Sequence, residues 1–108
     1  MSLLGILDAI EKIEAFTASF RDADEFYKNI VNFDATLMNF VVIGEMAHRL
    51  SEKFRTEQID IDWKKLKNFR NIVAHDYFGV DAEEVWQIIK HHLVKVKQDI
   101  QCMLKNMD

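Results

Sequence analysis

A short stretch near the middle of the chain concentrates side chains that can act on a phosphodiester. In chain order they are Lys64, Lys67, Arg70, Asn71 and His75. At about 100° per residue of an α-helix, these side chains fall on one continuous arc beside an apolar stripe. Ammonium and guanidinium groups neutralise phosphate charge, and an imidazole takes up and releases protons near neutral pH. The stretch therefore predicts a phosphodiester-binding groove in which Lys64 and Lys67 contact phosphate.

The same residues also have a purely structural interpretation. On that interpretation Arg70 is the partner in a surface ion pair, and His75 is a cation favoured by the dipole at a helix C-terminus. Tyr77, two residues further on, is then a core aromatic whose hydroxyl reaches the surface. Residue types and spacing by themselves leave both interpretations open.

The elements that position this stretch are predicted to be helices. The chain has no proline and only three glycines, too few turn residues for a β-rich fold. Apolar residues recur every three or four positions, which predicts helices over residues 2–20, 25–31, 34–54 and 63–76, and a last one after Asp81. The expected N-caps are Asp22 or Asp24, Asp34, Asp62 and Asp81, and Gly79 is expected to end the fourth helix in the left-handed conformation. This pattern predicts one domain over residues 1–108, an all-α, up-down helical bundle of four to five helices.

The first half of the predicted helix 34–54 is apolar on nearly all sides. Leu37, Met38, Val41 and Val42 add to a stripe that includes Phe40. A helix of this kind is buried on more than one side. We therefore expect a homodimer in which part of this helix meets a second copy. A central helix ringed by the others in a monomer is the alternative.

Composition limits the possible partners and compartments. Fourteen Lys and Arg against eighteen Asp and Glu give a net charge of −4, which argues against a protein that coats nucleic acid by bulk positive charge. The single cysteine, Cys102, excludes an intrachain disulfide and suits a reducing cytosol. The longest uncharged run, Ala35–Gly44, would extend about 15 Å as a helix, half of a bilayer. We expect a soluble, cytoplasmic protein that has no membrane partner.

No pattern for a metal or a cofactor is evident in the sequence. His91 and His92 are adjacent, so on a helix they point about 100° apart and make a poor metal pair. Both are expected to be structural. Glycine-rich phosphate loops and paired-carboxylate motifs are absent from the sequence. We expect neither a metal nor a cofactor.

The string of residues 70–79, RNIVAHDYFG, resembles the signature of the HEPN superfamily, and specifically of the HepT-like toxins. In that signature an Arg is followed by four residues, a His, one residue and a Tyr. Residues 43–50, IGEMAHRL, look like the family's "IGEAA..L" pattern, with Met46 where alanine is commoner. Residues 61–63 and 85–89 are also similar, so the likeness extends from about residue 8 to residue 100. The family pattern further suggests that Glu45 reaches Arg70.

The resemblance implies a dimeric helical bundle that cuts RNA, not DNA, without a metal. Its catalytic residues would be Arg70 and His75, with Asn71 in a supporting role. Cleavage needs both a base and an acid, and one histidine cannot be both at once, so two copies would share one cleft. The resemblance also implies a type VII toxin–antitoxin system, in which a cognate minimal nucleotidyltransferase silences the nuclease by transferring AMP to Tyr77. The alternative is a non-catalytic, nucleotide-binding or docking partner of such a nucleotidyltransferase.

Overall fold

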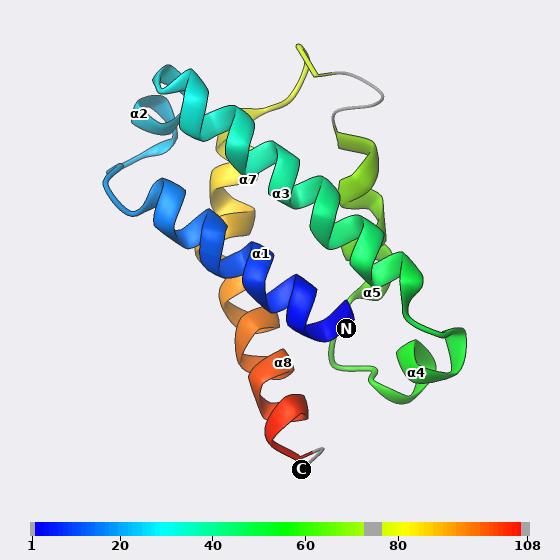
Figure 1. Cartoon of the computed structure of the whole chain (residues 1–108). Coiled ribbons are helices and arrows are strands. Elements are labelled where there is room, and N and C mark those ends of the chain that lie inside the picture. Colours follow the sequence, from blue (N-terminus) through cyan, green and yellow to red (C-terminus); the bar gives the residue numbers. More distant parts are fainter. Residues whose placement is uncertain (1, 73–76, 107–108) are drawn as a thin grey trace.

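The computed structural model of the chain describes residues 2–72 and 77–106, which form helices and no strand (Figure 1). Most of the helices are α-helices, with one 3₁₀ turn (η1) and one π-helical turn (η2). In chain order they are α1 (Ser2–Thr17), α2 (Ala23–Lys28), α3 (Ile30–Arg49), α4 (Glu52–Glu57), α5 (Trp63–Asn68), η1 (Phe69–Asn71), α7 (Ala82–Gln87), η2 (Ile88–His92) and α8 (Leu93–Asn106). The predicted all-α class is confirmed, whereas the homodimer and the single domain over residues 1–108 stay predictions.

The long helix α3 organises the bundle. Figure 1 shows α1 crossing it in the opposite direction, while α5 and η1 run beside its second half. The helices α7, η2 and α8 follow one another without a break and pass behind α1. The largest fully buried side chains come from most of these elements and include Ile6, Ile10, Ile13, Phe26, Leu37, Phe40, Ile43, Leu66, Leu93 and Ile100. Burial of each such side chain contributes about 1.5–3 kcal/mol to the free energy of unfolding.

Three of the predicted N-caps are confirmed. The side chains of Asp22, Asp62 and Asp81 accept hydrogen bonds from backbone N–H groups in the first turns of α2, α5 and α7. Of the two candidates before α2, Asp22 is the cap and not Asp24. A carboxylate at this position satisfies N–H groups that have no partner within the helix and opposes the positive end of its dipole.

The predicted helix 34–54 was wrong at both ends. It begins at Ile30, because the side chain of Asn29 accepts a hydrogen bond from the Asn32 N–H at 3.1 Å and thereby takes the N-cap role expected of Asp34. It ends at Arg49, because Ser51 caps a separate helix, α4. Asp34 therefore lies inside α3, where its side chain is available for another contact.

The predicted helix 63–76 also differs from the observed structure. The helix α5 ends at Asn68, a 3₁₀ turn follows over Phe69–Asn71, and Ile72 is again α-helical. Residues 73–76 lie outside the described residues. The expected left-handed Gly79 is wrong, because no glycine in the described ranges has a positive φ. The helix predicted over residues 2–20 ends at Thr17.

The helix α3 is also long and apolar enough, by length and composition alone, to cross a membrane. Central helices of bundles meet the same criteria. Here the buried side chains of α3, which include Phe33, Leu37, Phe40 and Ile43, belong to the core that α3 shares with α1, α5 and η1.

A glycine allows α3 and η1 to approach closely. A Cβ atom built on Gly44 would lie 2.9 Å from Arg70 Cβ and 3.0 Å from Arg70 Cα, and it would be closer still to the Arg70 backbone nitrogen. Two of these three atoms belong to the backbone, so the clash could be relieved only by moving η1. Gly44 thus fixes how near the chain at Arg70 comes to α3.

We predict that Gly44→Ala lowers the free energy of unfolding by about 1–3 kcal/mol through this clash, although alanine has the higher helix propensity. Gly5→Ala is the matched control, because a Cβ there would meet only the flexible side chain of Met46, at 3.1 and 3.2 Å. Urea unfolding at one fixed protein concentration measures both variants. A Gly44→Ala protein as stable as the Gly5→Ala protein would contradict the close approach.

Candidate active site

Arg70 lies in η1, against the outward face of α3. Its Nη1 is 3.8 Å from Oε1 of Glu45, and the two side chains are 34% and 46% exposed. Water screens a pair with this exposure, so it contributes at most about 1 kcal/mol to stability. Its main effect is on orientation, since it draws the guanidinium toward α3. The contact expected between Glu45 and Arg70 is therefore present.

The turn η1 is also packed on aromatic rings. Phe69 stacks on Phe40 of α3 with ring centroids 4.8 Å apart, and it meets His92 of η2 edge-on at 6.4 Å. Phe69 is buried, and the neighbouring Arg70 is only partly exposed. The turn that carries Arg70 is thus fixed on α3 by the stacking of Phe69 on Phe40 and by its close approach to Gly44.

Lys64 and Lys67, three residues apart on α5, line an open groove of about 630 Å³. Arg55 of α4 lines the same groove and donates hydrogen bonds from Nη1 to the carbonyls of Ala47 and His48, at 3.0 and 3.2 Å. Carbonyls in the last turn of a helix lack i+4 N–H partners, and the negative end of the helix dipole attracts a cation; the Ala47 carbonyl also accepts the Leu50 N–H at 3.3 Å. The sequence analysis did not predict that Arg55 lines this groove. Its position just after the predicted helix 34–54 was the available signal, because a cation near a helix C-terminus can bind the last carbonyls.

Asn71 points elsewhere. It is exposed and lines shallow pockets that also involve Ile72, Glu84 and Ile88, whereas the residues lining the Lys64–Lys67 groove come from α4 and α5. A 3₁₀ turn has about three residues per turn instead of 3.6, so each residue after Asn68 is rotated further around the axis than in an α-helix. The single arc expected from a regular helix is therefore not continued through Asn71.

His75, the second expected catalytic residue, lies outside the described residues. The motif is described again from Tyr77 onward. The hydroxyl of Tyr77 donates a hydrogen bond to the carboxylate of Asp34 on α3. This bond raises the pKa of Tyr77 above its ordinary value, and burial and the negative charge of Asp34 act in the same direction. Sequence reasoning missed this role of Asp34.

The ring of Tyr77 forms part of an apolar hollow of about 180 Å³ that Tyr27, Phe33 and Phe78 also line. Phe78 meets Tyr77 edge-on, with centroids 5.2 Å apart, and is 94% exposed. Tyr27 is 55% exposed. Aromatic side chains are thus presented to solvent next to the Tyr77 hydroxyl.

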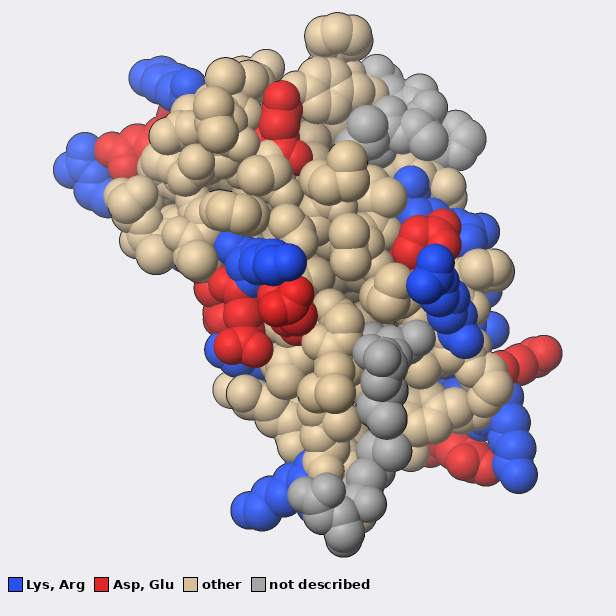
Figure 2. Space-filling view, in the orientation of Figure 1, with Lys and Arg blue, Asp and Glu red and all other residues tan. Residues whose placement is uncertain are grey.

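The face formed by α1 and α3 is largely uncharged, and Figure 2 shows Lys, Arg, Asp and Glu gathered mainly toward its edges. Large apolar side chains of this part of the chain are exposed, namely Leu4 on α1 and Ile30, Val31 and Met38 on α3. Single exposed apolar residues are common, but several on neighbouring elements are typical of a surface that contacts a partner.

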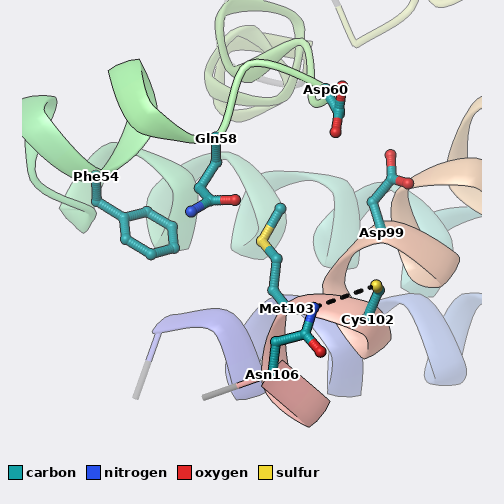
Figure 3. Close-up of a pocket in the computed structure, with 7 residues that line it drawn as sticks. All are labelled: Phe54, Gln58, Asp60, Asp99, Cys102, Met103 and Asn106. Atoms are coloured by element: carbon teal, nitrogen blue, oxygen red, sulfur yellow. Dashed lines mark hydrogen bonds between the residues drawn. The ribbon is translucent and has the colours of Figure 1, made fainter.

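Another pocket lies away from the motif, between α8 and the end of α4 (Figure 3). It has a volume of about 390 Å³ and is lined by Phe54, Gln58, Asp60, Asp99, Cys102, Met103 and Asn106. No residue of the sequence motif lines it. Among the described residues, no group of three or more His, Cys, Asp or Glu side chains is placed to hold a metal ion.

Comparison with known proteins decides the family. The pattern of the family described as ribonuclease HepT-like matches residues 6–103. The chain belongs to the HepT-like ribonuclease family. The resemblance inferred from the RNIVAHDYFG string is thereby confirmed. No solved structure matches the chain significantly.

Curated relatives of this HepT-like protein carry ribonuclease names. A "Putative RNase" of Methanocaldococcus jannaschii is 30% identical over 92% of this chain and 90% of its own length. A "Probable ribonuclease HepT" of Thermococcus cleftensis is 28% identical over 93% of this chain and 90% of its own length. A further M. jannaschii protein, named as both a gamma-glutamylcyclotransferase and a putative RNase, is 32% identical over 95% of this chain, which spans 46% of that protein.

Since His92 packs against the motif turn, its titration offers a test of that packing. Burial lowers the pKa of His92 below its ordinary value, and the charge of Lys65 adds to this. Below about pH 6.5 the unfolded chain therefore binds a proton more readily at this position, and folding stability falls as the pH drops. We predict that the unfolding free energy of His92→Gln decreases less between about pH 7 and 5 than that of the wild type. The variant His91→Gln, at the exposed neighbouring position, should show the same decrease as the wild type. Equal slopes in the two variants would contradict the prediction.

Proposed function

We propose that this HepT-like protein is a metal-independent endoribonuclease, the toxin of a type VII toxin–antitoxin system, acting in the cytoplasm. The observation that carries the proposal is the placement of Arg70. It is a partly exposed guanidinium on a turn held rigidly against α3, at the start of the family motif. The groove with Lys64 and Lys67 lies on the preceding helix and offers further cations for an RNA backbone.

The proposed reaction is attack of an RNA 2′-hydroxyl on the neighbouring phosphorus. A base removes the hydroxyl proton, the bond to the 5′-oxygen breaks, and an acid protonates that leaving oxygen. His75 has the side chain suited to both proton steps near neutral pH, and Arg70 opposes the charge that develops on phosphate. Two copies of His75 are needed if one is the base while the other is the acid.

A homodimer would supply the second copy. The exposed apolar side chains on α1 and α3, which include Leu4, Val31 and Met38, support an interface there. Glu45 lies on the outward side of α3, where Arg70 of η1 contacts it. A two-fold axis at this surface would bring two Arg70 side chains toward one cleft, as the mechanism requires.

Silencing by AMP on Tyr77 is supported by the position of its hydroxyl. The hydroxyl bonds to a surface carboxylate and stands beside exposed aromatic rings, where a partner enzyme can reach it. A transferred AMP adds both volume and a negative charge, so it would compete with RNA for Arg70 and the two lysines. The proposed partner is a minimal nucleotidyltransferase, and the proposed substrate of the free toxin is RNA.

We predict that Arg70→Ala and His75→Ala each abolish RNA cleavage by the purified protein in the presence of a metal chelator. Both variants should keep the wild-type circular-dichroism spectrum and remain dimers by light scattering, because the side chains proposed to act on RNA are not needed for folding. Cleavage of labelled RNA measures the effect, and relief of growth arrest in bacteria gives a second readout. A wild-type chain that cleaves no RNA in any assay would favour the non-catalytic partner instead.

We predict that co-expression with the proposed minimal nucleotidyltransferase partner adds the mass of one or more AMP units to this chain, on Tyr77. The chain has only two tyrosines, so Tyr27→Phe is the matched control. Intact-protein mass spectrometry should show the added mass in the wild type and in Tyr27→Phe, and its loss in Tyr77→Phe. Modification that survives Tyr77→Phe would assign the acceptor to another residue.

A further inference from the structure

Asp34 is the acidic partner of the residue that ends the motif. Its carboxylate accepts the hydrogen bond of the Tyr77 hydroxyl, across a separation of 43 residues in the sequence. Asp34 is exposed on α3, and Tyr77 is half-buried. A hydrogen bond to a charged acceptor is about twice as strong as one between neutral groups. It is a side-chain hydrogen bond that ties the chain after the motif histidine to α3.

Asp34 and Glu45 share one face of α3. They are eleven residues apart, or about three turns and roughly 16 Å along the helix axis. Glu45 contacts Arg70 at the start of the motif, and Asp34 contacts Tyr77 at its end. The two ends of the motif are therefore each held by a carboxylate from the same helix.

We propose that Asp34 is a positioning residue whose hydrogen bond holds Tyr77, and with it the end of the motif, against α3, and that nucleotide transfer to the hydroxyl releases this hold. The second half rests on the proposed function. His75 precedes Tyr77 by two residues, so fixing Tyr77 limits where the proposed catalytic imidazole can be. Asp34 would thereby support cleavage without touching RNA.

The chemistry of modification explains the release. The phenol oxygen attacks the α-phosphorus of a nucleoside triphosphate, an O–P bond forms, and the bond to pyrophosphate breaks. The phenol proton is lost to a base, so the donor of the hydrogen bond to Asp34 no longer exists. A phosphodiester anion would then stand beside the Asp34 carboxylate, and like charges at short range repel. Modification thus replaces an attraction by a repulsion at the same position.

The surroundings leave the hydroxyl reachable while the ring is held. The ring of Tyr77 meets Phe78 edge-on and lines the hollow together with Phe33, and the bond to Asp34 is exposed to solvent. Of the groups that act on the Tyr77 hydroxyl, Asp34 has the largest effect on its pKa, and the charge of Tyr27 adds to it. The hydrogen bond to Asp34 is therefore measurable as a raised pKa of the Tyr77 hydroxyl.

Spectroscopic titration of tyrosine tests the hydrogen bond directly. In a Tyr27→Phe background Tyr77 is the single tyrosine, so alkaline absorbance reports on it alone. We expect Asp34→Ala to shift its titration to lower pH, because the carboxylate that favours the protonated phenol is gone. Asp24→Ala, which removes another exposed acid of equal charge, should leave it unchanged. A titration that Asp34→Ala does not shift would overturn the inference.

Cleavage kinetics test the positioning role. Asp34→Ala and Tyr77→Phe should each lower kcat about tenfold or more with little change in KM, and the double variant should lose no more than either single one. Asp34→Asn, whose amide oxygen can still accept the hydrogen bond, should recover most of the activity. Wild-type kcat in Asp34→Ala would overturn the inference while leaving the proposed nuclease standing. A wild type that cuts no RNA would refute the proposed function, and the titration would then decide the hydrogen bond alone.

Discussion

At Gly44 the backbones of α3 and η1 come closer than any side chain would allow, since a Cβ there would lie 2.9 Å from Arg70 Cβ. This contact, together with the stacking of Phe69 on Phe40, sets the distance between η1 and α3. The Glu45–Arg70 ion pair follows from it, because Glu45 is the next residue on α3. A weak, solvent-screened pair can orient a guanidinium here because the backbone has already been brought within reach.

Much of the fold was predictable because apolar spacing and aspartate N-caps are local signals. Asp22, Asp62 and Asp81 begin helices as expected. Asp34 was misassigned, because an aspartate before an apolar run resembles a cap and Asn29 competes for the same role. The 3₁₀ turn at η1 was not predictable from residue types, since the spacing of apolar residues through Phe69 fits a regular α-helix.

The candidate site, like the fold, was only partly predictable from the sequence. The motif string predicted Arg70 and Tyr77 as site residues, and their roles stay predictions, whereas the ribonuclease family that the string indicated is shown. The partners of these residues, Glu45 and Asp34, lie on another helix, so only the packing of the chain reveals the contacts. The order Ile43–Gly44–Glu45 gains a physical meaning from this packing. The side chain of Ile43 is buried, Gly44 leaves room for the backbone of η1, and the side chain of Glu45 faces the Arg70 guanidinium.

The two carboxylates on α3 also bear on how the chain can vary in length. Inserting or deleting one residue between Asp34 and Glu45 would turn one carboxylate about 100° away from its partner and shift it 1.5 Å along the axis. Relatives that retain both contacts should therefore carry substitutions but no gaps over residues 34–45. Residues 58–62, which join α4 to α5, lie outside this stretch, so a change in their number would leave the angle between the two carboxylates unaltered. The repeat of the α-helix therefore fixes the spacing of the two contacts along α3.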